Sequence, residues 1–172
     1  MISISNCEGL HMTIKILEIK KENCPATRFI GKKYEKAPNW GEWWENDWFS
    51  ILESQERLPI NGNAYVGAVH IVNDMPEYWI GMFFSIDASV PKGFEYVDIE
   101  PLEYAVCYLY GKENSGDFYT VEAHNLCLEE LKTLGLKRKE DDWCFERYNC
   151  PRFTVPDENG NVILDYGIAI KD

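Results

Sequence analysis

The stretch WCFERY, residues 143–148, places a carboxylate inside an otherwise apolar and aromatic segment. Its alternating aromatic residues, followed by the turn-forming Asn149-Cys150-Pro151, predict a β-strand. Side chains alternate across a strand, so one face carries Cys144, Glu146 and Tyr148, and the other carries Trp143, Phe145 and Arg147. Because an unpaired buried charge is costly, Glu146 needs a cationic partner, a proton or a cationic ligand. The segment alone is compatible with a structural ion pair to a neighbouring strand and with a binding site.

In the rest of the chain, the same order of secondary-structure elements is predicted twice, once before and once after Pro91-Lys92-Gly93. The first half, 14–89, contains an interrupted strand (14–19 and 26–34), a helix (39–57) and two strands (64–72 and 78–86). The second half, 90–172, contains an interrupted strand (94–99 and 103–111), a helix (about 117–134) and two strands (142–148 and 162–170). Asn39 has capping-box spacing to Glu42, Gly135 is a C-cap, and 73–76 predicts the turn between the paired strands of the first half.

This repeat predicts an α+β fold made of a tandem pair of strand-helix-strand-strand modules. The modules form one antiparallel sheet with two helices packed on it. A pseudo-twofold axis between them leaves a groove where they meet, and clefts of that kind commonly bind ligands. We therefore expect a single domain over residues 1–172, in which residues 1–13 form a poorly patterned leader.

The charge balance excludes several classes of partner. Seventeen basic and 29 acidic side chains give a net charge of −12. Such a surface repels nucleic-acid backbones and anionic lipids, so we expect neither direct nucleic-acid binding nor a membrane partner. An acidic protein favours cationic small molecules or a basic patch on a partner protein, although solubility alone also explains an acidic surface.

The remaining chemistry-bearing residues predict no cofactor and no metal. The six cysteines form no C-x-x-C pair, and His11, His70 and His124 share no ligand spacing. Residues 157–161 (DENGN) lack calcium-loop spacing and predict a turn. With no signal peptide and no apolar run long enough to span a membrane, we expect a cytoplasmic protein with reduced thiols.

Aromatic residues make up 14% of the chain, and they suit either a ligand pocket or an aromatic core. The predicted first helix concentrates them, because Trp40, Trp44 and Trp48 fall on one stripe at helical spacing with Trp43 beside it. Such a stripe usually packs in a core. Four indoles at the start of one helix nevertheless exceed what packing ordinarily needs.

The second half resembles the GyrI-like small-molecule-binding family, which includes the effector-binding domains of AraC- and MerR-type multidrug-sensing regulators. The resemblance lies in an ordered series: Val90-Pro91-Lys92-Gly93-Phe94, Ile99-Glu100-Pro101, Tyr104-Ala105-Val106, Gly111, a helix, Glu146 with Tyr148, and an Ile-rich final strand. The first half matches in order and length. The resemblance implies the tandem fold predicted above. Regulators of this family carry a DNA-binding domain in front; nothing before Ile14 could be one, so we expect no direct transcription-factor role.

The resemblance also implies site residues. Glu146 corresponds to the acid that faces the groove and attracts cationic aromatic ligands, with Tyr104 and Tyr148 beside it. The stacking candidates are Trp40, Trp44, Tyr78 and Tyr108. Cation–π contacts contribute about 0.5–2 kcal/mol per ring, which supports binding of amphipathic, often cationic, aromatic molecules.

Two alternatives remain open. Stand-alone members have been assigned to hydrolysis of cyclopropane-bearing cytotoxins, for which Glu146 would be the general acid or base and Tyr104 a proton donor. Others act as gyrase inhibitors, and a protein-interaction module of gyrase-inhibitor or transcription-accessory type would use the acidic surface.

Overall fold

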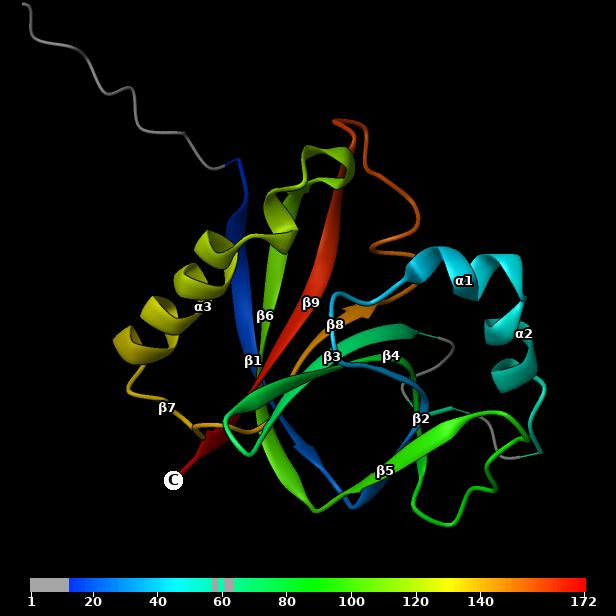
Figure 1. The fold of residues 1–172 in the computed structure, drawn as a ribbon. Coiled ribbons are helices and arrows are strands. Elements are labelled where there is room, and N and C mark those ends of the chain that lie inside the picture. Colours follow the sequence, from blue (N-terminus) through cyan, green and yellow to red (C-terminus); the bar gives the residue numbers. More distant parts are fainter. Residues whose placement is uncertain (1–12, 57–58, 61–63) are drawn as a thin grey trace, which may run out of the picture.

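Nine strands form one antiparallel sheet in the computed structural model, which describes residues 13–56, 59–60 and 64–172 (Figure 1). The strands are β1 (Lys15–Cys24), β2 (Thr27–Tyr34), β3 (Tyr65–Val72), β4 (Met75–Ser85), β5 (Glu95–Ile99), β6 (Leu102–Lys112), β7 (Lys137–Arg138), β8 (Cys144–Tyr148) and β9 (Asn161–Lys171). Their order is β1-β6-β9-β8-β3-β4-β2-β5, and β7 pairs with β9. The α+β class and the single antiparallel sheet predicted from the sequence are confirmed.

Both predicted strand interruptions exist, and the pieces on either side of them pair across the two halves. β1 pairs with β6 up to the pair Cys24–Leu102, and β2 pairs with β5 from Thr27–Ile99. Proline cannot donate to a strand ladder, so Pro25 and Pro101 stand at the two breaks. The first piece of each interrupted strand therefore lies beside a strand of the other half.

The helical segment predicted over 39–57 is two short helices, α1 (Trp40–Glu45) and α2 (Trp48–Glu53), so the single-helix prediction was wrong. The start was correct, because the Asn39 side chain accepts a hydrogen bond from the Glu42 backbone N–H at 3.4 Å. The break is at Asp47, whose φ of 53° is left-handed and incompatible with a continuing helix. Arg57, like residues 1–12 of the predicted leader, lies outside the described residues.

The second helical segment consists of a 3-10 turn, η2 (Asp117–Tyr119), and the helix α3 (Val121–Thr133), preceded by a 3-10 turn, η1 (Glu113–Ser115). Thr120 caps α3 by accepting the Ala123 backbone N–H at 3.2 Å, and Gly135, at φ 72°, follows its end as predicted.

In the first half, Asn73 and Asp74 alone make the turn between β3 and β4, both at positive φ. β4 therefore starts at Met75, and the predicted four-residue turn was too long. Along the described chain, no helix is long and apolar enough to cross a membrane.

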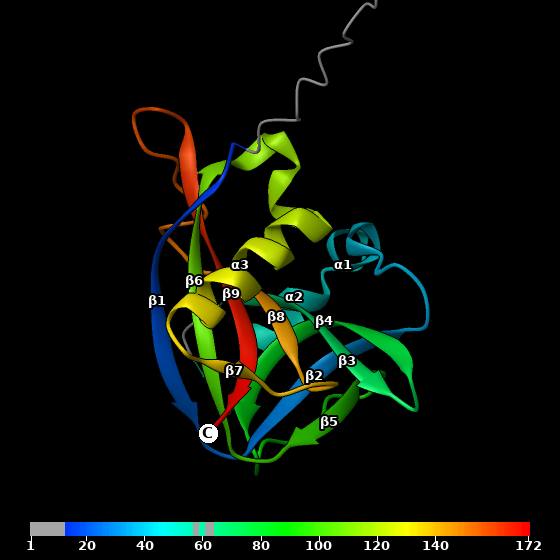
Figure 2. The same cartoon turned by 90° about the vertical axis from the view of Figure 1, so that its left-hand side faces the viewer.

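The helices cover two separate parts of one sheet face (Figures 1 and 2). α3 packs on β6 and β9 through Ala123, Cys127 and Leu131. α1 and α2 pack on β2 and β4, and burying Phe49 and Leu52 there stabilises the fold by about 1.5–3 kcal/mol each. A third apolar cluster, with residues from β2 to β6, β8 and β9, fills the opposite face of the sheet. The central strands β8 and β3 therefore lie between the two helical covers.

Candidate functional site

A cavity of about 840 Å³, here called the central cavity, lies against β8 and β3 beside the α1–α2 pair. Two turns also contribute to its lining, one being η2 and the other the 149–154 segment after β8. Its lining residues are Pro38, Trp40, Trp44, Glu53, Tyr65, Tyr78, Tyr119, Glu146, Tyr148, Cys150, Phe153 and Thr154. The lining is mostly aromatic, and its ionisable members include two carboxylates and no Lys, Arg or His.

Glu146 is half-buried on β8 and has one polar partner, the Tyr148 hydroxyl, which donates to its Oε2 at 2.6 Å. Strand alternation explains this contact, because residues two apart point to the same face. Among the described residues no Lys, Arg or His forms an ion pair with Glu146. Burial raises the pKa of Glu146, and the Tyr148 hydrogen bond opposes part of that effect. The carboxylate is therefore available to a cation.

Gly67 makes room for an indole beside this carboxylate. It is the β3 partner of Glu146, and a Cβ at this position would lie 3.0 Å from Cζ2 of Trp40 and 3.7 Å from Oε2 of Glu146. A side chain on β3 would thus push the Trp40 ring away from the strand. The glycine allows the first residue of α1 to reach the centre of the sheet.

Packed rings hold the walls of the central cavity. Trp40 meets Tyr148 edge to face at 5.3 Å between ring centroids, and Tyr148 meets Phe153 in the same way at 4.8 Å. On the other side the buried Phe49 stacks on Tyr65 at 3.7 Å, and Trp44 leans on Tyr65 at 5.6 Å. Trp44 is still 60% exposed, so its indole is accessible at the mouth of the cavity.

Glu53, the second acid of the lining, comes from α2 and is also half-buried. Its carboxylate lies near the hydroxyl of Tyr65. Burial, together with the interaction with Glu53, raises the pKa of Tyr65 to about 12, so the tyrosine hydroxyl stays protonated. Within the described chain Glu53 has no ion-pair partner.

A smaller cavity of about 130 Å³ adjoins the central cavity and shares Trp40 and Glu146 with it. Its lining also includes Cys144 and Tyr166, and Tyr166 is the β9 partner of Glu146. The Tyr166 hydroxyl lies 2.8 Å from Nδ1 of His124 on α3. His124 is thus a hydrogen-bonded residue between helix and sheet.

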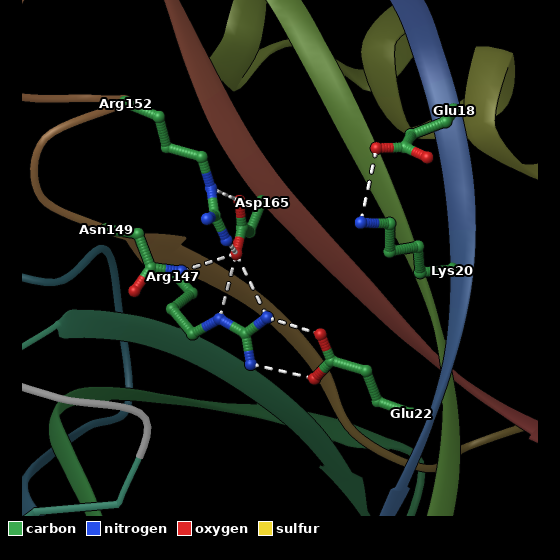
Figure 3. Close-up of polar contacts among 7 residues, drawn as sticks. All are labelled: Glu18, Lys20, Glu22, Arg147, Asn149, Arg152 and Asp165. Atoms are coloured by element: carbon green, nitrogen blue, oxygen red, sulfur yellow. Dashed lines mark hydrogen bonds and ion pairs between the residues drawn. The ribbon is translucent and has the colours of Figure 1, made fainter.

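The opposite face of β8 carries the ion pairs (Figure 3). Arg147 is 3% exposed and donates to both carboxylate oxygens of Glu22 at 2.9 and 2.8 Å and to Oδ2 of the fully buried Asp165 at 3.0 Å. Arg152 donates to Oδ1 of Asp165 at 2.7 Å. This cluster ties β8 to β1, β9 and the 149–154 turn. The structural ion pair considered for Glu146 is therefore formed by its neighbour Arg147.

Five of the seven residues proposed from the sequence come together in the central cavity: Trp40, Trp44, Tyr78, Glu146 and Tyr148. Tyr104 and Tyr108 do not. Tyr104 is 2% exposed and packs edge to face on Phe145 at 5.0 Å, on the opposite face of the sheet. Tyr108 lies under the cations of Lys20 and Arg152 at 5.2 and 4.9 Å.

The sequence interpretation missed four aromatic or acidic lining residues, which are Glu53, Tyr65, Tyr119 and Phe153. Tyr65 had a detectable signal, because strand alternation places it on the same face as Gly67, opposite the Glu-x-Tyr strand. The other three lie at the end of a short helix or in turns, where no periodic pattern marks the direction of a side chain.

No protein-family model and no curated protein sequence matches this chain. Several experimental structures share its fold. SAV2435 bound to tetraphenylphosphonium matches with a TM-score of 0.66 and 11% identity, over 90% of this chain and 94% of that one. A candidate transcription regulation protein of Staphylococcus aureus MU50 matches with a TM-score of 0.63 and 13% identity, over 90% and 99%. The C-terminal domain of EcmrR matches with a TM-score of 0.59 and 8% identity, over 90% and 98%. These matches confirm the GyrI-like fold.

Proposed function

We propose that the chain binds amphipathic small molecules that carry a positive charge and aromatic rings, and that it holds them in the central cavity. The main support for this proposal is Glu146, a half-buried carboxylate whose only polar partner within the described chain is a neutral tyrosine. A lipophilic cation would neutralise this charge and stack on the rings of Trp40 and Tyr148. Cation–π contacts of about 0.5–2 kcal/mol per ring would add to the Coulomb attraction.

The size and polarity of the cavity support this ligand class. Its volume of about 840 Å³ is in the range of sites for drug-sized ligands, roughly 300–1,000 Å³. Its charges have one sign, which disfavours anionic ligands. The structure of SAV2435, with the same fold, holds tetraphenylphosphonium, a cation with aromatic rings. The proposal extends that class of ligand to this chain.

We also propose that residues 14–89 and 90–172 are pseudo-symmetric halves of one domain. The strand order supports this arrangement, because exchanging β1 with β5, β6 with β2, β9 with β4 and β8 with β3 reproduces it in reverse. The axis would then pass between β8 and β3, and the central cavity would lie beside it.

A cytoplasmic setting fits the free thiols of Cys24, Cys107, Cys127, Cys144 and Cys150.

The direct experiment is a titration with tetraphenylphosphonium, followed by tryptophan fluorescence and calorimetry. The parent protein should bind it saturably, and Glu146→Gln should lose about 1.5–3 kcal/mol of binding free energy, the scale of a charge-assisted contact. The neutral triphenylphosphine oxide should respond much less to this substitution. Glu129→Gln, an exposed acid on α3, is the matched control. A folded protein without saturable binding would reject the proposal.

Hydrolysis of strained electrophiles is a second candidate, favoured by the 2.6 Å hydrogen bond between Tyr148 and Glu146. Burial raises the pKa of Glu146 toward the range of a general acid or base. Tyr148, and not the buried Tyr104, is the hydroxyl in reach. If a cyclopropane-bearing substrate is turned over, Glu146→Gln should reduce kcat by roughly 10²–10⁴-fold while substrate affinity changes little.

A further inference from the structure

The central cavity has two carboxylates at different places, and one cation can neutralise only one of them. Glu146 lies on β8 at the middle of the sheet, where Gly67 and Trp40 adjoin it. Glu53 is the last residue of α2 and lies on the helical side of the cavity. Both are half-buried, and in the described part of the chain neither has a basic partner.

Each of the two carboxylates has a tyrosine beside it. Tyr148 donates to Glu146, and the hydroxyl of Tyr65 lies near Glu53. Tyr65 and Tyr148 are directly opposite on β3 and β8, so their Cβ atoms are about 4.5–5.5 Å apart. Ring contacts connect them through two further residues: Tyr148 meets Trp40 at 5.3 Å between centroids, Trp40 meets Phe49 at 6.1 Å, and Phe49 stacks on Tyr65 at 3.7 Å. Each tyrosine leaves the charge of its glutamate in place, because a neutral hydroxyl cannot cancel it.

We infer that the central cavity is selective for elongated aromatic dications, with one cationic group at Glu146, the other at Glu53, and the linker over Tyr65 and Tyr148. This inference rests on the proposed function and specifies its ligand class. A monocation leaves a second negative charge in a partly desolvated cavity, where charges interact more strongly than in water. A dication of suitable length neutralises both.

The indoles fit the two ends of such a ligand. Trp40 lies at the Glu146 end, with its ring 5.3 Å from that of Tyr148. Trp44 lies at the Glu53 end, with its ring 5.6 Å from that of Tyr65. Each cationic head would therefore meet one carboxylate and one indole, and tryptophan is the strongest cation–π partner among the side chains.

The experiment compares N-alkylquinolinium monocations with bis-quinolinium dications of increasing polymethylene length by isothermal titration calorimetry. We expect one dication per chain, an affinity maximum at an intermediate linker, and about ten- to hundredfold tighter binding of the best dication than of its monocation. Glu53→Gln should remove most of that advantage while lowering monocation affinity by about threefold or less. Glu146→Gln should weaken both ligands by about tenfold or more.

Glu45→Gln, an exposed acid on α1 outside the cavity lining, is the control for net charge and should leave both affinities at parental values. Thermal unfolding checks that each variant is folded. Equal affinity for monocations and dications at every linker length, with Glu146→Gln still weakening the monocation, would overturn this inference and leave the proposed function intact. If the folded parent protein binds neither quinolinium nor phosphonium cations, both this inference and the proposed function are overturned.

Discussion

The surroundings of Glu146 disfavour the charged form of its carboxyl group. Burial raises its pKa, and the Tyr148 hydroxyl offsets that effect only in part. The folded protein without ligand therefore contains a carboxylate that is poorly solvated and has no ion-pair partner among the described residues. A bound cation would supply the missing partner, so the same feature that costs stability favours ligand binding.

Cation affinity should consequently depend on pH. Because the pKa of Glu146 lies above its ordinary value of 4.5, protonation begins at a higher pH than for an exposed glutamate. Tetraphenylphosphonium affinity should be highest at pH values above the raised pKa and fall as the pH decreases through it. Fluorescence titrations over a pH series provide the measurement, with Glu146→Gln as a control whose weaker affinity stays flat. A flat profile for the parent would contradict the assignment of Glu146 to the ligand.

The same group predicts a gain in stability on its removal. A carboxyl whose folded pKa exceeds its unfolded pKa favours folding when it is protonated, and this contribution is lost as the pH rises through the folded pKa. At neutral pH, Glu146→Gln should therefore raise the free energy of unfolding by on the order of 1 kcal/mol, as at other functional sites where activity opposes stability. Urea unfolding at pH 7 tests this, and the gain should vanish in acid, below the unfolded pKa. A destabilised variant at neutral pH would mean that the charged form has a stabilising role.

At the residue scale, the sequence predicted which side chains lie together where alternation along one strand was enough. Glu146 and Tyr148 share a face because they are two residues apart, and the tryptophans were marked by helical spacing. Tyr104 could not be placed in this way. Its face relative to Glu146 depends on the register of β6 against β9 and of β9 against β8, which no single-strand pattern contains.

At the scale of elements, the approach of α1 to β3 depends on one missing side chain. Trp40 contacts the sheet at Gly67, where a Cβ would lie 3.0 Å from the indole. Gly67→Ala should displace Trp40 slightly and Gly67→Val should displace it further, because the β3 backbone cannot retreat. We expect a graded loss of tetraphenylphosphonium affinity and overpacking costs of about 1–3 kcal/mol for valine. Titration of both variants, with thermal unfolding as the check on folding, is the measurement; parental affinity in Gly67→Val would argue against a ligand beside Trp40.

The element boundaries that the sequence did not predict have local causes. The first helix breaks at Asp47 because this residue takes a left-handed conformation, for which the Asn46-Asp47 pair is suited. The helical spacing of the neighbouring tryptophans predicts one continuous helix, so it does not reveal this break. β4 starts three residues early because Asn73 and Asp74 suffice for the turn, and Pro76 is accommodated within the strand. In both cases the type of element was predictable, while its end depended on one or two backbone conformations.

For the whole molecule, the order of elements was predictable and the pairing of strands was not. Hydrophobic patterns predicted strands on both sides of Pro25 and Pro101, but a pattern does not identify the partner of a strand. In the structure the partners come from opposite halves, as in the pairs β1–β6 and β2–β5. The apolar cluster on the face away from the helices is also shared, since Phe29 and Phe83 of the first half pack with residues such as Phe145 of the second.

Because strands of the two halves pair with each other and share an apolar cluster, we expect that neither half is stable alone. Fragment 14–89 would lose the β6 partner of β1, the β8 partner of β3 and the second half of the shared apolar cluster, so it would expose both unpaired strand edges and large apolar side chains. We expect both fragments, 14–89 and 90–172, to be unfolded by circular dichroism. The intact chain should unfold in one transition, with tryptophan fluorescence and far-UV circular dichroism giving the same midpoint. The tryptophan probe reports mainly on the first half, which contains five of the six indoles, so two separate transitions would be visible as a difference between the probes. A fragment that folds independently, or midpoints that differ, would show that the halves are separate folding units joined by a smaller interface than the strand pairing implies.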